Sequence, residues 1–206
     1  RTIVDHSRSE PAIDLGAFPN TDFWYFWSSS FYAGGFQVWR VSFISGSVTT
    51  TGPSDVLYVR CVRGGALGGQ RTRTELVAGQ PVVTDSVTGL EWQGCPAGLT
   101  GSACASGSAV VKAWPEALSY CESLNWGNAV DWRLPNVNEL SSIADDRKAN
   151  PSVDTMAFPN TPPTMFWSSS TADGPVYAWL VYFDFGGINR DLKTSVANVR
   201  CVRNAP

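Results

Sequence analysis

Three consecutive serines, Ser168, Ser169 and Ser170, are the residues of this chain that most resemble a nucleophilic site. A serine acts as a nucleophile when a histidine lies close enough to take its proton and a carboxylate orients that histidine. The single histidine, His6, lies far away in sequence, and we expect it to be a solvated surface residue. A Ser-His-Asp arrangement is therefore excluded, and the sequence predicts a protein that is not an enzyme.

Four aspartates, Asp145, Asp146, Asp184 and Asp191, could supply the oxygen ligands that calcium prefers. The sequence lacks the EPN, QPD and WND signatures of the sugar-binding calcium sites in C-type lectins. Solvated loops, with Asp145 capping a helix end, are the favoured interpretation. We expect no cofactor and no metal ion, with calcium as the alternative.

The five cysteines lack the CxxC spacing of a zinc or redox site. Disulfides in an oxidising compartment are the better interpretation. Cys95 and Cys104 would close a short loop, and Cys121 and Cys201 would join a helix to the last strand. Cys61 is then left without an intrachain partner.

Composition narrows the class of protein further. The formal net charge is −3 and the only lysines are Lys112, Lys148 and Lys193, whereas nucleic-acid binding needs a concentrated basic face. No run of about 18–20 apolar residues is present to span a membrane. The first residues do not read as a signal peptide, so we expect either that a leader was removed or that the chain is a fragment.

The elements that must position these residues can be read from the pattern. Residues 81–85 and 90–93 predict a strand hairpin. An apolar stripe predicts a helix over 114–125. Asn136 and Glu139 form a capping box that begins a second helix, whose buried residues would be Val137, Leu140 and Ile143.

Strands follow the helices. Residues 165–167 and 177–183 are aromatic and β-branched, Gly186 and Gly187 predict a turn, and residues 199–203 predict a final strand with Arg200 facing away from Val199 and Cys201. The predicted fold class is α+β, with two helices, an antiparallel sheet and disulfide staples.

The chain also repeats itself. Residues 3–63 align with residues 143–203 at a constant offset of 140, with about 25 of 61 positions identical. Residues 80–142 have no counterpart in the first copy. We therefore predict half a repeat over 1–63, a Gly-rich linker over 64–79 and one complete domain over 80–206.

A half-repeat has too little core to fold by itself. We expect it either to stay unfolded or to be completed by a missing segment or by another copy of the chain. The sequence thus favours self-association.

Several motifs occur in order over the second copy: TGLEWQ, AWPEALSYC, DWRLPNVNEL, FPNT, FWSSS and VRCVR. Together they resemble the Lcl C-terminal domain family of bacterial surface proteins. The family resembles the C-type-lectin-like and formylglycine-generating-enzyme-like superfamily, which implies a C-type-lectin-like fold. Its founding adhesin is a trimer that binds sulfated glycosaminoglycans, so the resemblance implies adhesion outside the cell or on its surface. Residues 80–206 carry eight Lys or Arg and twelve Asp or Glu, which disfavours a sulfated ligand.

The least similar stretch of the two copies, 171–198 against 31–58, corresponds to the ligand-carrying loops of lectin-like folds. The candidate ligand-binding residues there are Asp173, Tyr177, Asn189, Arg190, Asp191 and Lys193. Tryptophan could also stack on sugars. We expect a core role for Trp27, Trp39, Trp92, Trp114, Trp132, Trp167 and Trp179. The surface candidates are Trp24 and Trp126.

We therefore predict a secreted or surface-exposed binding module of a tandem-repeat protein. Its ligand would be a glycan or another cell-surface molecule. The alternative is a subunit of an extracellular fibre or oligomer in which the half-repeat is completed by another chain.

Arg133, just before the second helix, is expected to be buried and bonded to carbonyls.

Overall fold

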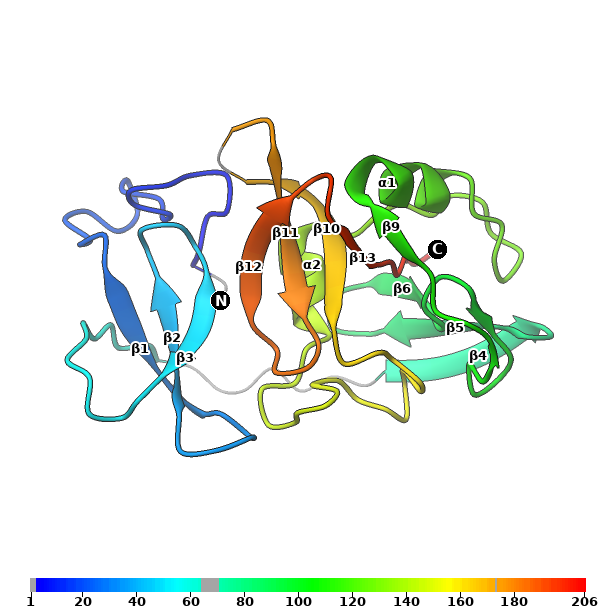
Figure 1. The fold of residues 1–206 in the computed structure, drawn as a ribbon, viewed down its shortest axis with the longest axis horizontal. Coiled ribbons are helices and arrows are strands. Elements are labelled where there is room, and N and C mark those ends of the chain that lie inside the picture. The colour runs from blue at the N-terminus through cyan, green and yellow to red at the C-terminus, as the bar shows by residue number, and fades with distance from the viewer. Residues whose placement is uncertain (1–2, 64–70, 173) are drawn as a thin grey trace.

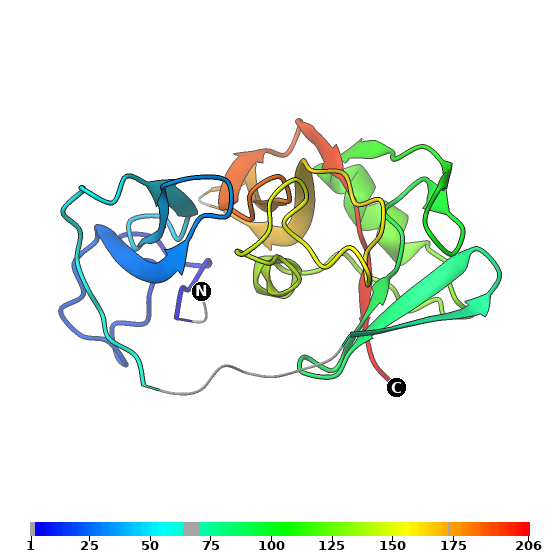
Figure 2. The ribbon, with the colours of Figure 1, turned by 90° about the horizontal axis from the view of Figure 1, so that it is seen from below.

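The structure is a computed structural model that describes residues 3–63, 71–172 and 174–206 (Figure 1). The first copy contributes three strands: β1 (Tyr25–Phe31), β2 (Val38–Ser42) and β3 (Val48–Thr51). The second copy and its preceding strand contribute β4 (Arg71–Val77), β5 (Gln80–Asp85), β6 (Leu90–Gln93), β7 (Leu99–Thr100), β8 (Ser106–Gly107), β9 (Val111–Ala113), α1 (Trp114–Glu122), α2 (Val137–Ser142), β10 (Met165–Thr171), β11 (Tyr177–Tyr182), β12 (Ile188–Leu192), β13 (Val196–Asn198) and β14 (Val202–Asn204). The two copies lie side by side along the long axis (Figures 1 and 2).

One sheet runs through both copies in the order β1-β2-β3-β12-β11-β10-β13-β9. The copies meet where Val48 of β3 pairs with Ile188 of β12. The sheet is mixed and not antiparallel as predicted, because β13 runs parallel to β10. A parallel neighbour needs a long crossover, and the chain from β10 through β11 and β12 supplies it.

A second sheet has the order β14-β6-β5-β4. It confirms the predicted hairpin of β5 and β6 and adds a strand that we did not predict. Residues 71–77, assigned to an irregular linker, form β4 and pair with β5. The arginines of this segment add contacts to the strand pairing: Arg71 lies 2.9 Å from the carboxylate of Asp85, and Arg73 donates to the oxygens of Gly94 and Ala157. Residues 64–70 of the predicted linker lie outside the described residues, and the domain boundaries stay a prediction.

Both predicted helices are present. In α1, Ala117 and Cys121 are buried, and the helix ends at Glu122, before the predicted residue 125. The capping box of α2 is confirmed: the Asn136 side chain accepts from the backbone N–H of Glu139, and the Glu139 carboxylate accepts from the backbone N–H of Asn136.

The sheet carries a core on each face. One core lies against α2 and includes Phe166, Trp179 and Phe183. The other lies under α1 and includes Trp167 and Leu180. Alternation along β10 and β11 sends successive side chains to opposite cores.

The described residues of the first copy fold against the second copy, and completion of the half-repeat by another chain stays a prediction. Trp39 and Val48 join the core of the second copy, and Phe26, Phe43 and Ile13 form a smaller cluster beside it. The half-repeat therefore uses the neighbouring complete copy as the other wall of its core.

The final strand differs from the prediction. Residues 199–201 lie between β13 and β14, and Val199, Arg200 and Cys201 are all buried. Arg200 is enclosed because its guanidinium donates to the backbone oxygens of Gln93 and Gly94.

Two disulfides are formed as predicted, Cys95–Cys104 and Cys121–Cys201, and Cys61 is a free, exposed cysteine. The fold is mostly β, with two short helices and two disulfides. A C-type-lectin-like arrangement stays a prediction. Within the described ranges, no helix is long and apolar enough to cross a membrane.

Candidate functional site

A cleft of about 1080 Å³ lies between the two copies. One wall comes from the N-terminal segment of the first copy, and the other comes from the start of α2 and the end of β10. Most of its side chains are polar: Asp5, His6, Ser7, Ser9, Asp14, Asn136, Asn138, Ser169, Ser170 and Thr171. Phe18, Val137 and Ala172 add apolar surface.

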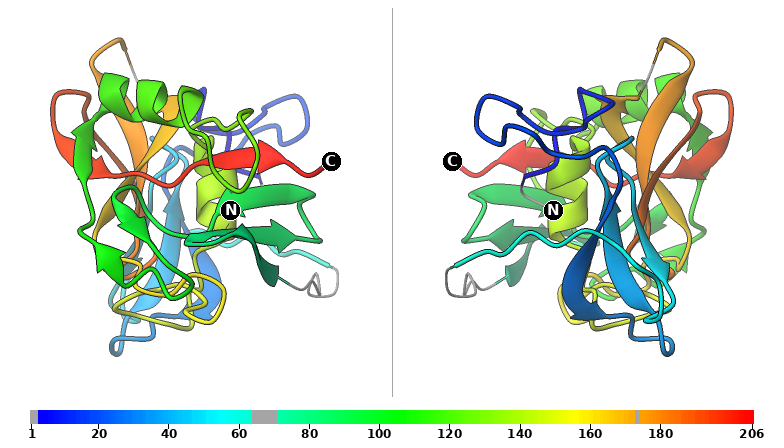
Figure 3. Two further views of the ribbon diagram at one scale, coloured as in Figure 1. Left: turned by 90° about the vertical axis from the view of Figure 1, so that its right-hand side faces the viewer. Right: turned by 90° about the vertical axis from the view of Figure 1, so that its left-hand side faces the viewer.

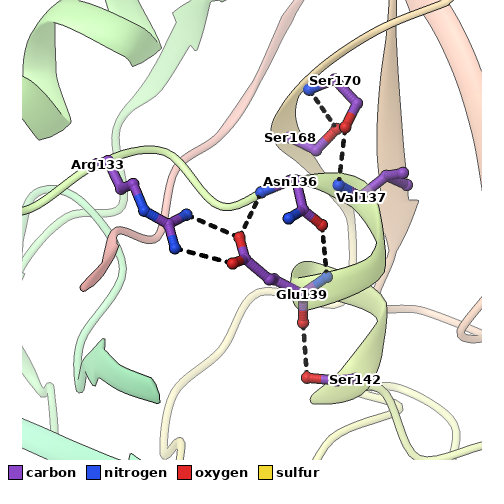
Figure 4. A network of polar contacts seen from close by, with 7 residues as sticks. All are labelled: Arg133, Asn136, Val137, Glu139, Ser142, Ser168 and Ser170. Atoms are coloured by element: carbon purple, nitrogen blue, oxygen red, sulfur yellow. Dashed lines mark hydrogen bonds and ion pairs between the residues drawn. The ribbon is translucent and has the colours of Figure 1, made fainter. Parts of the chain in front are cut away.

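The α2 wall is fixed by a network that starts at Arg133 (Figure 4). The guanidinium of Arg133 donates to both carboxylate oxygens of Glu139, at 2.7 and 2.8 Å. This pair raises the pKa of Arg133, mainly through the hydrogen bond to Glu139. The prediction of a buried Arg133 was wrong, because its side chain is 41% exposed and its partner is a carboxylate and not a carbonyl.

The serine run joins the same wall. The hydroxyl of Ser170 accepts from the backbone N–H of Val137 at 3.1 Å (Figure 4). The N–H of Ser169 donates to the Pro135 oxygen at 2.7 Å. Ser168 is buried and donates to the Trp179 carbonyl. These bonds hold the β10 end against the start of α2.

The first-copy wall is anchored by His6. Its backbone oxygen accepts from the indole N–H of Trp179 at 3.2 Å, and the two rings meet edge to face at 4.9 Å. The prediction of a solvated His6 was wrong, since the residue is only 8% exposed. The Asp5 carboxylate next to it accepts from the Ser7 hydroxyl, and this bond is the main cause that lowers the pKa of Asp5.

The structure thus brings the histidine and the serine run to one cleft, which the sequence reasoning missed. Within the described residues, neither ring nitrogen of His6 is hydrogen-bonded to a serine hydroxyl. Burial lowers the pKa of His6 to about 4, against the opposing effects of Gly46 and Asn138. This arrangement is a buried neutral imidazole beside hydroxyls and not a nucleophile–base pair.

Because His6 is buried, the free energy of unfolding depends on pH. An unfolded histidine titrates near its ordinary pKa of 6.5, and the folded one near 4. Protonation then favours the unfolded chain, so stability is full above pH 6.5 and falls as the pH drops toward 4, by about 3 kcal/mol in total. Urea unfolding at about pH 7 and about pH 4.5 measures this fall. A His6→Gln variant should show a smaller fall, and an equal fall in both proteins would contradict the assignment.

The chemistry of the cleft follows from its lining. Hydroxyl, amide and carboxylate groups line it, including the carboxylates of Asp5 and Asp14. None of the lining residues that the structure describes is Lys or Arg. Hydroxyls and amides both donate and accept hydrogen bonds, so the cleft suits a polar ligand without negative charge.

The residues predicted to bind ligand lie elsewhere, on β11, β12 and the turn after β12. Paired residues share a face, so Arg190, opposite Trp179, lies on the α2 face, and Asn189 and Asp191 lie on the α1 face. Arg190 lies over the Tyr177 ring at 5.6 Å. The structure therefore does not gather them into one site.

Two candidates remain from that set. The ammonium group of Lys193 lies 4.3 Å from the centre of the Trp114 ring and donates to the Pro175 oxygen. Asp173 lies outside the described residues, between Ala172 and Gly174 of the cleft lining. Their role in binding stays a prediction.

The tryptophans follow the core prediction in most cases. Buried ones are Trp39, Trp92, Trp132, Trp167 and Trp179. Trp27 and Trp114 are half-buried, and Trp24 is 51% exposed. The prediction of a surface role for Trp126 was wrong, because its indole N–H is buried and donates to the Pro81 oxygen at 2.8 Å.

The acidic residues considered for calcium are dispersed. Asp145 bonds the backbone and side chain of Arg147, and Asp184 accepts from the N–H of Phe185. In the part of the chain that the structure describes, no group of three or more His, Cys, Asp or Glu residues is placed to hold a metal ion.

Comparison with known proteins agrees with the repeat. No curated protein sequence matches the chain. The model of the Lcl C-terminal domain matches twice, over residues 1–63 and 81–203. These two segments cover nearly all of the sequence and both copies of the repeat, and the chain belongs to the Lcl C-terminal domain family.

Proposed function

We propose that this protein is an extracellular, non-enzymatic binding module of a bacterial surface protein, and that the cleft between its copies binds an uncharged polar ligand such as a neutral glycan. The observation that carries the proposal is the lining of that cleft, which is rich in hydroxyl and amide groups and has no cation among its described residues.

Three further features support the proposal. Two disulfides in a chain of this size are typical of proteins from oxidising compartments. The hydroxyls of Ser168 and Ser170 already hold backbone groups, so they serve as structure and not as nucleophiles. The family match favours a surface-binding role.

The ligand class differs from that of the family's founding adhesin. A sulfated polymer needs clustered Lys and Arg, whereas the cleft presents Asp5 and Asp14. The proposal therefore expects binding to neutral glycans that persists as the salt concentration rises, since exposed charge pairs are screened by salt and neutral hydrogen bonds are not.

A glycan array probed with the full chain, at low and high salt, tests this expectation. Asn138→Ala and Thr171→Ala remove polar groups from the cleft and should each weaken binding by about tenfold or more. Asn125→Ala, an exposed asparagine outside the cleft, is the matched control and should leave binding unchanged. Retention of sulfated glycans only, or equal binding by all variants, would overturn the proposal.

A second function, assembly into an oligomer or fibre, is favoured by a different observation. The last residues of the first copy are exposed, although their counterparts in the second copy are buried: Val59 and Val62 are 70% and 96% exposed. Light scattering and electron microscopy of the chain alone test assembly, which requires discrete oligomers or filaments; a monomer at all concentrations would contradict it.

A further inference from the structure

The two copies act as an internal comparison, because residues 3–63 and 143–203 align and residues 80–142 pack against the second of them. The end of the first copy is seated as in the second. Arg60 donates to the hydroxyl of Thr21 at 2.7 Å, and Arg200 donates to that of Thr161 at 2.8 Å. Phe26 pairs in parallel with Tyr58, as Phe166 does with Asn198.

The ends of the two copies differ in how far other residues cover them. We call the residues Leu57, Tyr58, Val59, Cys61 and Val62 the open face. Their counterparts Ala197, Asn198, Val199, Cys201 and Val202 are each at most 5% exposed. In the open face, Tyr58 is 45% exposed, Val62 is 96% exposed, and Cys61 is a free thiol.

One stretch of the second copy provides the cover, and we call residues 81–122 the covering segment. β6 pairs with β14, placing Trp92 opposite Val202. The N–H of Gln93 donates to the Cys201 oxygen at 2.9 Å, and the N–H of Ala97 donates to the Val199 oxygen at 2.9 Å. β9 pairs with β13, and Cys121 of α1 closes the disulfide with Cys201.

The first copy has a hollow where this cover would lie. A groove of about 650 Å³ is lined by Trp24, Val56, Leu57 and Tyr58. In the second copy the counterpart of Leu57, Ala197, pairs with Lys112 of β9. The groove is therefore the place that a β9-like strand would fill. Both helices of the described chain, α1 and α2, belong to the second copy (Figure 3).

We infer that the open face binds a covering segment from a second polypeptide of this family, meaning a strand hairpin and a strand–helix unit whose helix cysteine forms a disulfide with Cys61. The inference goes beyond both proposed functions, because it names a partner other than another copy of this chain. The covering segment of residues 81–122 is tied to its own copy by Cys121–Cys201, so it cannot also cover the first copy. Another copy of the same chain could not donate it without uncovering its own face.

The covalent step is a thiol–disulfide exchange. The Cys61 thiolate attacks a mixed disulfide between the partner's helix cysteine and a small extracellular thiol such as glutathione. The sulfur–sulfur bond to the small thiol breaks, a new bond joins Cys61 to the helix cysteine, and the small thiol leaves with the proton that Cys61 lost.

The test uses the full chain and, as a probe, a polypeptide of residues 81–122 with its Cys95–Cys104 disulfide closed and Cys121 carrying glutathione. We expect a one-to-one adduct at Cys61 by intact mass and peptide mapping. It should form at least about tenfold faster than with a scrambled polypeptide of the same composition, because docking raises the effective concentration of the thiol.

Substitutions at exposed residues test binding without disturbing the fold. Val59→Asp and Val62→Asp should reduce the rate to that of the scrambled probe, and Val130→Asp, at a valine that is 69% exposed on the second copy, should not change it. A Cys61→Ser chain should still bind the probe, without a covalent bond. Equal rates for the two probes, or for all valine variants, would overturn the inference. Capture of the probe supports the inference even if the chain alone stays monomeric, and failure of capture overturns it even if the chain alone assembles.

Discussion

Replacing Cys121 and Cys201 together with alanine is expected to lower the free energy of unfolding by about 4–5 kcal/mol. The disulfide closes a sequence separation of 80 residues, and the loss of chain entropy on unfolding grows with the length of the closed loop. It also joins α1 to the chain just before β14, so its removal frees the cover of the second copy. Urea unfolding followed by tryptophan fluorescence measures the change.

The Cys95–Cys104 pair is the matched control. Its sequence separation is only 9 residues, so the Cys95→Ala, Cys104→Ala variant should lose about 2–3 kcal/mol on the same reasoning. The long-loop variant must be the less stable of the two. The opposite order would show that α1 does not depend on its link to the last strand.

Arg200→Ala is expected to destabilise the chain by about 3–5 kcal/mol. Arg200 is 1% exposed, and its guanidinium donates to the Gln93 oxygen at 2.8 Å and to the Gly94 oxygen at 3.0 Å. A third bond goes to Thr161, and the cation lies 4.7 Å from the centre of the Phe158 ring. The alanine variant leaves these groups without their donor and opens a cavity.

The repeat offers a matched control, Arg60→Ala. Arg60 makes the same bond to Thr21 and lies 5.1 Å from the Phe18 ring, but it is exposed and no covering segment lies over it. We expect a loss of about 1 kcal/mol or less, as for other exposed residues. Equal losses at Arg60 and Arg200 would contradict the account of the open face. Thermal or urea unfolding of both variants decides between the two results.

Local patterns in the sequence predicted much of the fold. Capping at Asn136 and the apolar stripe around Cys121 depend on residues that are close in sequence. The Cys121–Cys201 pairing was predicted by placing one cysteine on the buried stripe of the helix and the other on the last strand. The repeat predicted equivalent strands, and β1 and β10 do span the same aligned positions.

The parts that failed depend on contacts between distant segments. β4 pairs with β5 and places Arg71 against Asp85, a contact that composition alone does not reveal. His6 is buried only because the first copy lies against Trp179, 173 residues along the chain. Trp126 is buried because it reaches Pro81.

The cleft was not predicted for the same reason. The cleft is made by two copies, and lectin-like reasoning on one copy led to β11 and β12 instead. Two signals were available, the lone histidine and the serine run, but each was judged within its own copy. The histidine and the serine run come together only where the two copies pack side by side.

The central claim is that one copy is closed and the other is open, and that Cys61 marks the open one. Labelling the native, unreduced chain with a maleimide, followed by intact-mass analysis and peptide mapping, tests it most directly. The account predicts a single adduct, on Cys61, that forms rapidly without denaturant, with Cys95–Cys104 and Cys121–Cys201 intact. A chain that takes up label only after unfolding, or takes it up on Cys121 or Cys201, would contradict it.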